Sequence, residues 1–232
     1  MSTRTPPAAR RRASPRRAPV PSLAHERHWW EQGAIVCGVD EVGRGAWAGP
    51  VAYGAVILPR TRRLYKLRDS KVLEPGWRRE LAGRVRRTAL AVSVGQASND
   101  EIDRLGMSAA MRLGARRAVE GLPLRPDVCL LDGNWDFLSD LPTTNETIVG
   151  GDGRSASIAA ASIVAKVARD DQMVDACPAY PAYRFSSNKG YPTPDHLAAL
   201  ARWGPCGLHR RSWRPIGAAG PPSPILAWAE EH

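Results

Sequence analysis

The chain is poor in lysine, and the few lysines that remain mark positions of interest. Of its 33 basic residues, 29 are arginines. Arginine presents a planar fork of donors and lysine a compact, flexible charge, so the two do not substitute freely at a phosphate or in a crowded site. In a chain that otherwise prefers arginine, lysine is expected mainly where arginine would not serve. The four lysines are Lys66, Lys71, Lys166 and Lys189.

Cysteine and long apolar runs are also scarce. The four cysteines show neither paired metal-ligand spacing nor a disulfide framework, which fits a reducing compartment. No apolar run approaches the roughly 20 residues of a membrane helix, and the N-terminus lacks the apolar stretch of a secretory signal. We therefore expect a cytoplasmic protein without a membrane partner. Cys37 and Cys129 lie in strand-like runs, where we expect buried thiols.

Acidic residues are absent from residues 1–24, which contain six arginines and five prolines. Such a segment cannot bury enough surface to fold, so we expect a disordered basic tail. The net charge is +10, and subtracting the tail's 6 leaves about +4 on the rest of the chain. The tail either contacts nucleic-acid phosphates or is a solvated extension, and we narrowly favour the extension. A transit peptide is disfavoured by the prolines.

Apolar runs alternate with amphipathic segments in the remainder, which predicts an α/β fold with helices on the faces of a sheet. A chain of 232 residues suits one full-sized core. We expect one main domain over residues 25–216, followed at 217–232 by a Pro/Gly linker and a short terminal helix. Strands are predicted at 34–42, 51–58, 89–95, 127–132 and 146–149, and helices at 22–32, 74–87, 99–120, 155–171, 195–202 and 225–231.

Carboxylates stand at the ends of the predicted strands. Asp40 and Glu41 end the first strand. Asp132 ends the fourth, and Asp152 follows the fifth. The carboxyl ends of parallel strands frame the ligand crevice of an open α/β sheet, so these acids can meet there. Because successive strand residues point to opposite faces, Asp40 and Glu41 reach one site only if the strand bends or bulges, which the following glycines permit.

Clustered carboxylates require compensation by protons or by hard cations. Oxygen ligands without His or Cys indicate Mg²⁺ or Mn²⁺ rather than zinc. Two such ions about 4 Å apart serve an in-line displacement at phosphorus, one activating water and the other stabilising the leaving oxygen. The residues alone therefore favour a phosphodiesterase, although each acid taken singly is as readily explained as a turn residue.

Eight sequence blocks, in order along the chain, resemble ribonuclease HII. The match runs from about residue 35 to about residue 215, nearly all of the chain outside its two ends. A lone Asp-Glu or Gly-Arg-Gly would mean little, whereas eight blocks in one order are highly specific. The blocks are GVDEVGRG (38–45), AGPV (48–51), DSK (69–71), LLDGN (130–134), GD (151–152), SIAAASIVAKVARD (157–170), KGYPT (189–193) and HRRSW (209–213).

The resemblance implies a ribonuclease H-like fold, which is a mixed five-stranded sheet flanked by helices with a C-terminal helical extension. It implies metal-dependent endonucleolytic cleavage of RNA in RNA–DNA hybrids and incision beside single ribonucleotides in duplex DNA, giving 3′-hydroxyl and 5′-phosphate ends. Those two nucleic acids are the expected partners of a monomeric enzyme that uses two Mg²⁺ or Mn²⁺ ions. The residues that match the family's catalytic and metal-binding carboxylates are Asp40, Glu41, Asp132 and Asp152.

Further residues match the family's substrate-binding parts. Gly43, Arg44 and Gly45 resemble a turn whose backbone reads the ribose 2′-hydroxyl, which glycine allows the main chain to approach closely. Tyr191 resembles the aromatic residue that stacks on the neighbouring deoxyribose. Together they would read an RNA-to-DNA junction instead of a base sequence.

Three of the four lysines fall inside the blocks. Lys71 resembles a phosphate contact near the metals. Lys166 and Lys189 match positions that serve either as phosphate contacts or in the structure. Lys66 lies outside the blocks, so survival as lysine is not by itself a sign of function.

The chain also departs from the family pattern. Ala46-Trp47 replaces the more usual Pro-Leu and puts a bulky ring near the substrate entrance or under it. Gly150 stands where a lysine often precedes the Gly-Asp. Two alternatives to the junction ribonuclease remain. A DNA-specific nuclease or recombinase on the same fold would not need the 43–45 turn or Tyr191. A catalytically silent hybrid-binding protein would not need four acids.

Overall fold

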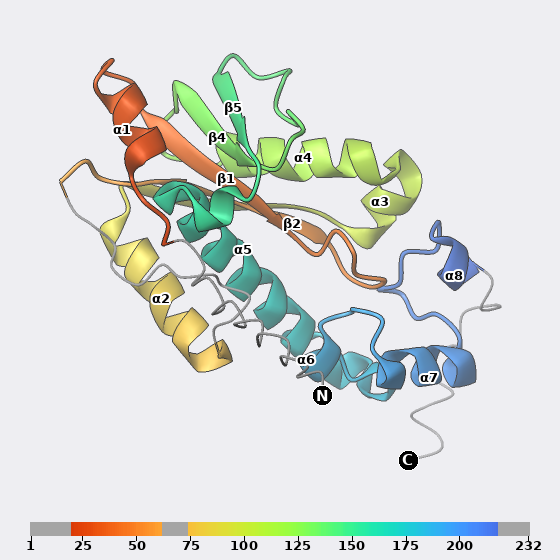
Figure 1. Cartoon of the computed structure of the whole chain (residues 1–232). Coiled ribbons are helices and arrows are strands. Elements are labelled where there is room, and N and C mark those ends of the chain that lie inside the picture. The colour runs from red at the N-terminus through yellow and green to blue at the C-terminus, as the bar shows by residue number, and fades with distance from the viewer. Residues whose placement is uncertain (1–19, 62–73, 218–232) are drawn as a thin grey trace, which may run out of the picture.

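In a computed structural model, the chain forms a five-stranded mixed sheet with helices on both faces (Figure 1). The structure describes residues 20–61 and 74–217. Most of the basic tail, Lys66, Lys71 and the helix predicted at 225–231 lie outside the described residues. None of the helices in the described ranges has the length and apolar character needed to cross a membrane.

The strand order is β3-β2-β1-β4-β5. The central strand β1 (Val36–Val42) is antiparallel to β2 (Val51–Ile57) and parallel to β4 (Val128–Asp132). β3 (Ala91–Ala97) pairs antiparallel with β2 at one edge, and β5 (Thr144–Ile148) pairs parallel with β4 at the other. The carboxyl ends of β1, β4 and β5 therefore lie at the same end of the sheet, and the predicted mixed five-stranded sheet is confirmed.

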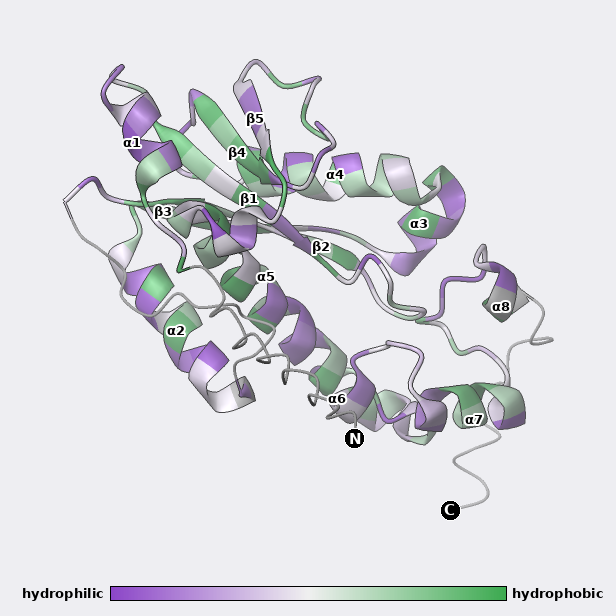
Figure 2. Cartoon of the chain, viewed as in Figure 1, coloured by the Kyte–Doolittle hydropathy of each residue, from purple (hydrophilic) through white to green (hydrophobic). Residues whose placement is uncertain are grey.

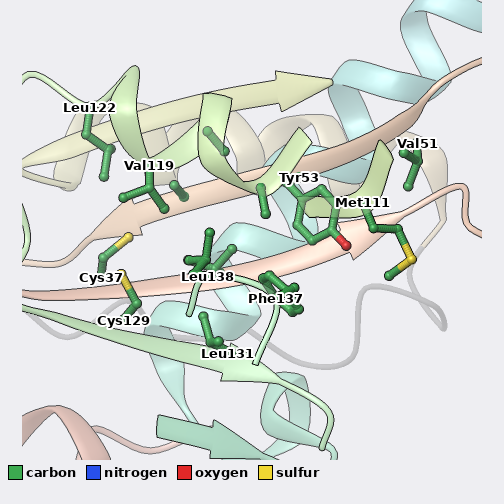
Figure 3. Packing of buried hydrophobic residues seen from close by; sticks show 14 of the residues in the cluster. Cys37, Val51, Tyr53, Met111, Val119, Leu122, Cys129, Leu131, Phe137 and Leu138 are labelled. Atoms are coloured by element: carbon green, nitrogen blue, oxygen red, sulfur yellow. The ribbon is translucent and has the colours of Figure 1, made fainter. Parts of the chain in front are cut away.

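One face of the sheet packs against α4 (Met107–Glu120), where the largest hydrophobic core lies. In this core the rings of Tyr53 and Phe137 are 5.2 Å apart (Figure 3). Cys37 and Cys129 are paired neighbours on β1 and β4, both buried and free, as expected from the sequence. Apolar contacts in this core fix β1 and β2 relative to each other.

The other face packs against α5 (Ala156–Asp175), with α2 (Pro75–Thr88) lying against α5 (Figure 1). The contact between α5 and the sheet is very close. A Cβ atom on Gly38 would lie 2.2 Å from the Ser157 carbonyl carbon, and one on Gly54 would lie 2.2 Å from the Ala161 carbonyl oxygen. Glycines in the strands and small residues on the helix thus let α5 run along β1 and β2 toward the carboxyl end of β1.

The sequence predicts one helical region over 99–120, but the structure divides it. Gly106, with φ of 79°, separates α3 from α4, because this backbone conformation cannot continue a helix. Beyond α5, short helices form the C-terminal helical extension (Figure 1). They pack around Tyr183 and Phe185 and against Ala48. The other helices are α1 (Ala24–Trp30), α3 (Asn99–Leu105), α6 (Phe185–Asn188), α7 (Pro194–Trp203) and α8 (Arg214–Gly217).

Candidate active site

The ends of β1 and β4 place two acids side by side. The parallel ladder between these strands runs as far as Val39 opposite Leu131. The next residues on the two strands are Asp40 and Asp132, so their carboxylates follow the last apolar pair. Figure 2 shows this change, because β1 is mostly hydrophobic and turns hydrophilic near its carboxyl end.

Of the bend or bulge expected in β1, the structure shows no bulge. Its pairing with β2 is regular, with Asp40 opposite Gly54 and Glu41 opposite Tyr53. The two carboxylates therefore leave opposite faces of the strand. Both still line one cleft, at the tip of β1 beyond Val39, where the pairing with β4 ends.

Three of the four acids line a cleft of about 260 Å³ together with most of the predicted substrate-binding residues. The lining residues are Asp40, Glu41, Val42, Gly43, Arg44, Gly45, Asp132, Ser162, Lys166 and Tyr191. The structure thus brings together the predicted site residues apart from two. Asp152 lies beside this lining, and Lys71 lies outside the described residues.

Asp152 is held next to the cleft by the turn that carries it. The turn is a short 3-10 helix, Gly151–Gly153, and its first N–H donates to Asp132 Oδ1 at 2.6 Å. This hydrogen bond ties the turn to the end of β4. The negative charge of Asp152 contributes to the raised pKa of Asp40, so the fourth acid lies within electrostatic reach of the first.

Asp40 is buried, with 4% of its surface exposed. Burial raises the pKa of its carboxyl well above the ordinary value, a hydrogen bond with Ser162 lowers it, and the charges of Asp132, Glu41 and Asp152 raise it further. Its Oδ1 accepts a hydrogen bond from the Glu41 backbone N–H at 2.7 Å. Burial and like charges both disfavour the ionised form, so a cation entering the cluster would stabilise the carboxylate.

The donor set fits a hard divalent cation in its chemistry. Carboxylate oxygens without His or Cys are what Mg²⁺ and Mn²⁺ prefer, and the concentration of negative charge around Asp40 is what such an ion offsets. Within residues 20–61 and 74–217, however, no three His, Cys, Asp or Glu side chains are already arranged as metal ligands. The carboxylates converge on one cleft and would have to rotate to close around an ion.

One side of α5 supplies Ser162 and Lys166 to the cleft, and Arg169 follows them on the same side in the buried interior. Ser162, Lys166 and Arg169 are four and three residues apart, so they lie along one side of the helix. Lys166 Nζ donates to Asp170 Oδ1 at 2.6 Å and lies 5.7 Å from the centre of the Tyr191 ring. Burial lowers the pKa of Lys166, while its hydrogen bond to Asp170 raises it. The sequence analysis identified Lys166 and missed Ser162 and Arg169, which lie in the same block.

Arg210 is fully buried. It binds the backbone carbonyls of the turn that is predicted to read the 2′-hydroxyl. Its Nη2 donates to the Gly43 carbonyl at 2.6 Å and its Nη1 to the Arg44 carbonyl at 2.9 Å. Its Nε donates to the Gly49 carbonyl at 3.0 Å. Burial and the charge of Arg169 lower the pKa of Arg210 to about 9, which leaves it charged at neutral pH. This arginine lies in the last sequence block, but its role was not foreseen.

Arg169 joins the same loop to the segment that carries Tyr191. It donates to the carbonyls of Pro50 at 2.8 Å, Ala48 at 3.0 Å and Lys189 at 2.9 Å. Its guanidinium lies 5.3 Å from the centre of the Tyr191 ring. The loop that follows the 43–45 turn and the segment that carries Tyr191 are therefore fixed to each other through one buried side chain.

The two glycines of the 43–45 turn have different structural roles. Gly43 is buried with φ of 86°, and a Cβ there would lie 2.1 Å from Arg169 Nε, so the packing requires glycine. Gly45 is exposed, and a Cβ there would meet nothing within 4 Å. Gly43 thus seats the turn on the buried arginine, while Gly45 leaves main-chain groups open to the cleft.

Tyr53 is another residue beside the acids that the sequence analysis missed. It stands opposite Glu41 in the sheet, and its buried hydroxyl has no hydrogen-bond partner among the residues that the structure describes. Burial and the charges of Glu41 and Asp40 raise the pKa of Tyr53, so the phenol stays protonated. The sequence feature that could have pointed to Tyr53 is that it is the one large polar residue in a strand of small and β-branched residues.

Comparisons with known proteins agree with these observations. The Ribonuclease HII family model matches residues 37–216. The chain is 50% identical to Ribonuclease HII of Moorella thermoacetica over 192 residues, 82% of this chain and 92% of that protein. It is 45% identical to Ribonuclease HII of Lactobacillus gasseri over 194 residues, 84% of this chain and 76% of that protein.

A solved structure supports the same assignment. The ribonuclease H2 of Pyrococcus horikoshii OT3 superposes with a TM-score of 0.68 at 25% identity, covering 79% of this chain and 96% of that one. The family model and the relatives each span most of the chain, and the range of the family model includes the cleft described above. This chain belongs to the ribonuclease HII family.

Proposed function

We propose that this protein is a metal-dependent endonuclease that cleaves the RNA strand of RNA–DNA hybrids and incises at ribonucleotides embedded in duplex DNA. Membership of the ribonuclease HII family supports the hydrolysis of RNA in hybrids. The finer proposal depends on one observation. A single cleft is lined by acids from the ends of β1 and β4, by the Gly43–Gly45 turn and by Tyr191.

In this proposal the four acids hold two Mg²⁺ or Mn²⁺ ions. When bound, such ions supply an activated water and stabilise the leaving oxygen of the phosphodiester, which gives 3′-hydroxyl and 5′-phosphate ends. The chain's own contribution is to orient the ligands. The backbone N–H of Glu41 and the Ser162 side chain bond to Asp40, and the N–H of Gly151 bonds to Asp132.

Substrate selection in this proposal comes from the other side of the cleft. The Gly43–Gly45 turn offers main-chain groups to a ribose 2′-hydroxyl, and Arg210 keeps that turn from adapting to a different sugar. Tyr191 stacks on the deoxyribose that follows. Lys166, which lies in the cleft beside the Tyr191 ring, contributes positive charge toward a phosphate. Lys71 is proposed as a second phosphate contact on the resemblance alone.

Cleavage of three labelled duplexes tests the proposal. They share one sequence and contain a single ribonucleotide in DNA, a complete RNA strand, or DNA only, and each is incubated with Mg²⁺ and with EDTA. We expect both ribonucleotide-containing duplexes to be cut only with metal, leaving ends that a polymerase extends, and the DNA duplex to remain intact. Cleavage of the DNA duplex would instead support a DNA nuclease. Binding of the hybrid without cleavage would support a silent hybrid-binding protein.

A further inference from the structure

Two histidines that the proposed chemistry does not use form a buried chain of hydrogen bonds behind Tyr191. His196 on α7 and His209 are 0% and 1% exposed, and their Nε2 atoms are 3.0 Å apart. At one end, His196 Nδ1 lies 2.8 Å from the Tyr191 carbonyl oxygen. At the other end, the Cys206 backbone N–H donates to His209 Nδ1 at 2.9 Å. We call these four linked residues the histidine chain.

The backbone groups at its two ends determine where every proton in the histidine chain lies. The Cys206 amide is a donor, so His209 Nδ1 accepts and His209 carries its proton on Nε2. The Tyr191 carbonyl can only accept, so His196 carries its proton on Nδ1. The remaining bond then runs from His209 Nε2–H to His196 Nε2. A second proton on either ring would place two N–H donors face to face. All hydrogen bonds of the histidine chain therefore form only when both rings are neutral.

The surroundings favour neutral rings at physiological pH. Burial and the neighbouring His196 and Arg211 together lower the pKa of His209 to about 3. Burial also lowers the pKa of His196, while the hydrogen bond to the Tyr191 carbonyl raises it. Both rings thus remain in the form that the hydrogen bonds require.

The packing around the rings leaves them little freedom. Tyr183 lies with its ring 4.9 Å from that of His209, and Phe185 lies 5.5 Å from that of His196. Burial raises the pKa of Cys206 to about 11, so its sulfur, 3.2 Å from His209 Nδ1, remains a protonated thiol. Within the part of the chain that the structure describes, these His and Cys side chains do not form a metal site.

We propose that the histidine chain positions Tyr191, and that His196 is thereby a positioning residue for the reading of the ribose-to-deoxyribose step. This inference rests on the proposed function. The same segment continues from His209 directly into Arg210, which holds the Gly43–Gly45 turn. One short segment therefore anchors both elements that face the sugar, and the distance between them depends on the histidine chain as well as on Arg169.

The protonation pattern can be measured without any activity. Nitrogen NMR of the wild-type protein at pH 7 distinguishes the two neutral tautomers of each histidine. The proposal requires a proton on Nδ1 of His196 and on Nε2 of His209, with the exposed His28 as the reference signal. The opposite tautomer on either buried ring, or a charged ring, would overturn the chain whether or not the protein cuts nucleic acid.

A matched pair of variants tests the positioning role. Asparagine places its amide near the Nδ1 position of histidine and glutamine places its amide near the Nε2 position. His196→Asn therefore keeps a donor for the Tyr191 carbonyl, and His196→Gln does not. The readout is the ratio of kcat/KM on the single-ribonucleotide duplex to kcat/KM on the complete RNA strand, with Tyr191→Ala as the reference for lost selection.

We expect the ratio to stay near wild type in His196→Asn and to fall about tenfold in His196→Gln, the effect of one buried hydrogen bond. Cleavage of the complete RNA strand should change little in either variant. Equal ratios in the two folded variants would overturn the positioning role. His209→Phe, which preserves a ring but removes both hydrogen bonds, serves the same test if the His196 variants do not fold. If the wild-type protein cuts neither duplex, the proposed function is wrong. The NMR result then still shows whether the hydrogen bonds of the histidine chain exist.

Discussion

Replacing Arg210 with methionine measures how firmly the substrate-reading turn is held. The guanidinium donates to four backbone carbonyls, those of Gly43, Arg44, Gly49 and Pro50, at 2.6 to 3.1 Å. Hydrogen bonds from a charged donor contribute about 1.5–3 kcal/mol each, but several bonds from one group are not additive. Losing one member of a buried charged network costs roughly 3–5 kcal/mol, so we expect the free energy of unfolding to fall by that amount.

The assay is equilibrium unfolding in urea, followed by cleavage of the single-ribonucleotide duplex under conditions where the variant is folded. The exposed neighbour is the matched control, and Arg211→Met should change stability by less than about 0.5 kcal/mol. Arg210→Lys should recover little stability, because an ammonium cannot reproduce the fork of donors. If Arg210→Met loses less than about 1 kcal/mol, or if lysine restores both stability and cleavage, the turn does not depend on the guanidinium geometry.

Four further changes have distinct expected results. Asp132→Asn should keep folding and hybrid binding but lower the Mg²⁺-dependent cleavage rate by more than about 100-fold, and retained cleavage would remove this acid from the mechanism. Tyr191→Ala should weaken the preference for the ribose-to-deoxyribose step in a cleavage-site map, and an unchanged map would contradict its role. Gly43→Ala should destabilise the protein by at least about 1–2 kcal/mol in urea unfolding, because φ is 86° and the new Cβ would meet Arg169; wild-type stability would show that the turn can shift. The pKa of Asp40 is raised in the folded protein. Between pH 3.8, the ordinary value, and this raised pKa, the folded state binds more protons than the unfolded state, so the free energy of unfolding falls as pH rises through this range. Asp40→Asn should therefore raise the unfolding temperature of the metal-free protein at pH 7, and a lower temperature would contradict the raised pKa.

The arrangement of the acids could be predicted because it depends on local signals. Apolar runs that end in Asp40 or Asp132 are visible along the chain, and parallel pairing of β1, β4 and β5 then places those ends together. The sequence required a bend or a bulge in β1, and the regular pairing with β2 contains no bulge. The alternation rule took no account of where pairing with β4 stops, and it stops at Val39.

The buried arginines could not be predicted from the sequence for a different reason. In a chain with 29 arginines, one that bonds to distant carbonyls looks the same as one at the surface. The acceptors of Arg169 and Arg210 include Pro50 and Gly43, which lie 119 and 167 residues away along the chain. The histidine chain was hidden in the same way, since its directionality follows from backbone groups that only the fold brings to the rings.

The central claim is that four separate acids surround shared hard cations, and metal-induced stabilisation tests it most directly. The measurement is the rise in unfolding temperature with increasing Mn²⁺ for the wild type and for the single variants Asp40→Asn, Asp132→Asn and Asp152→Asn, with exposed Glu120→Gln as the control. We predict that the wild type and the control gain stability with metal, and that each of the three variants loses most of this gain. A full gain in the Asp132 or Asp152 variant would contradict the shared site.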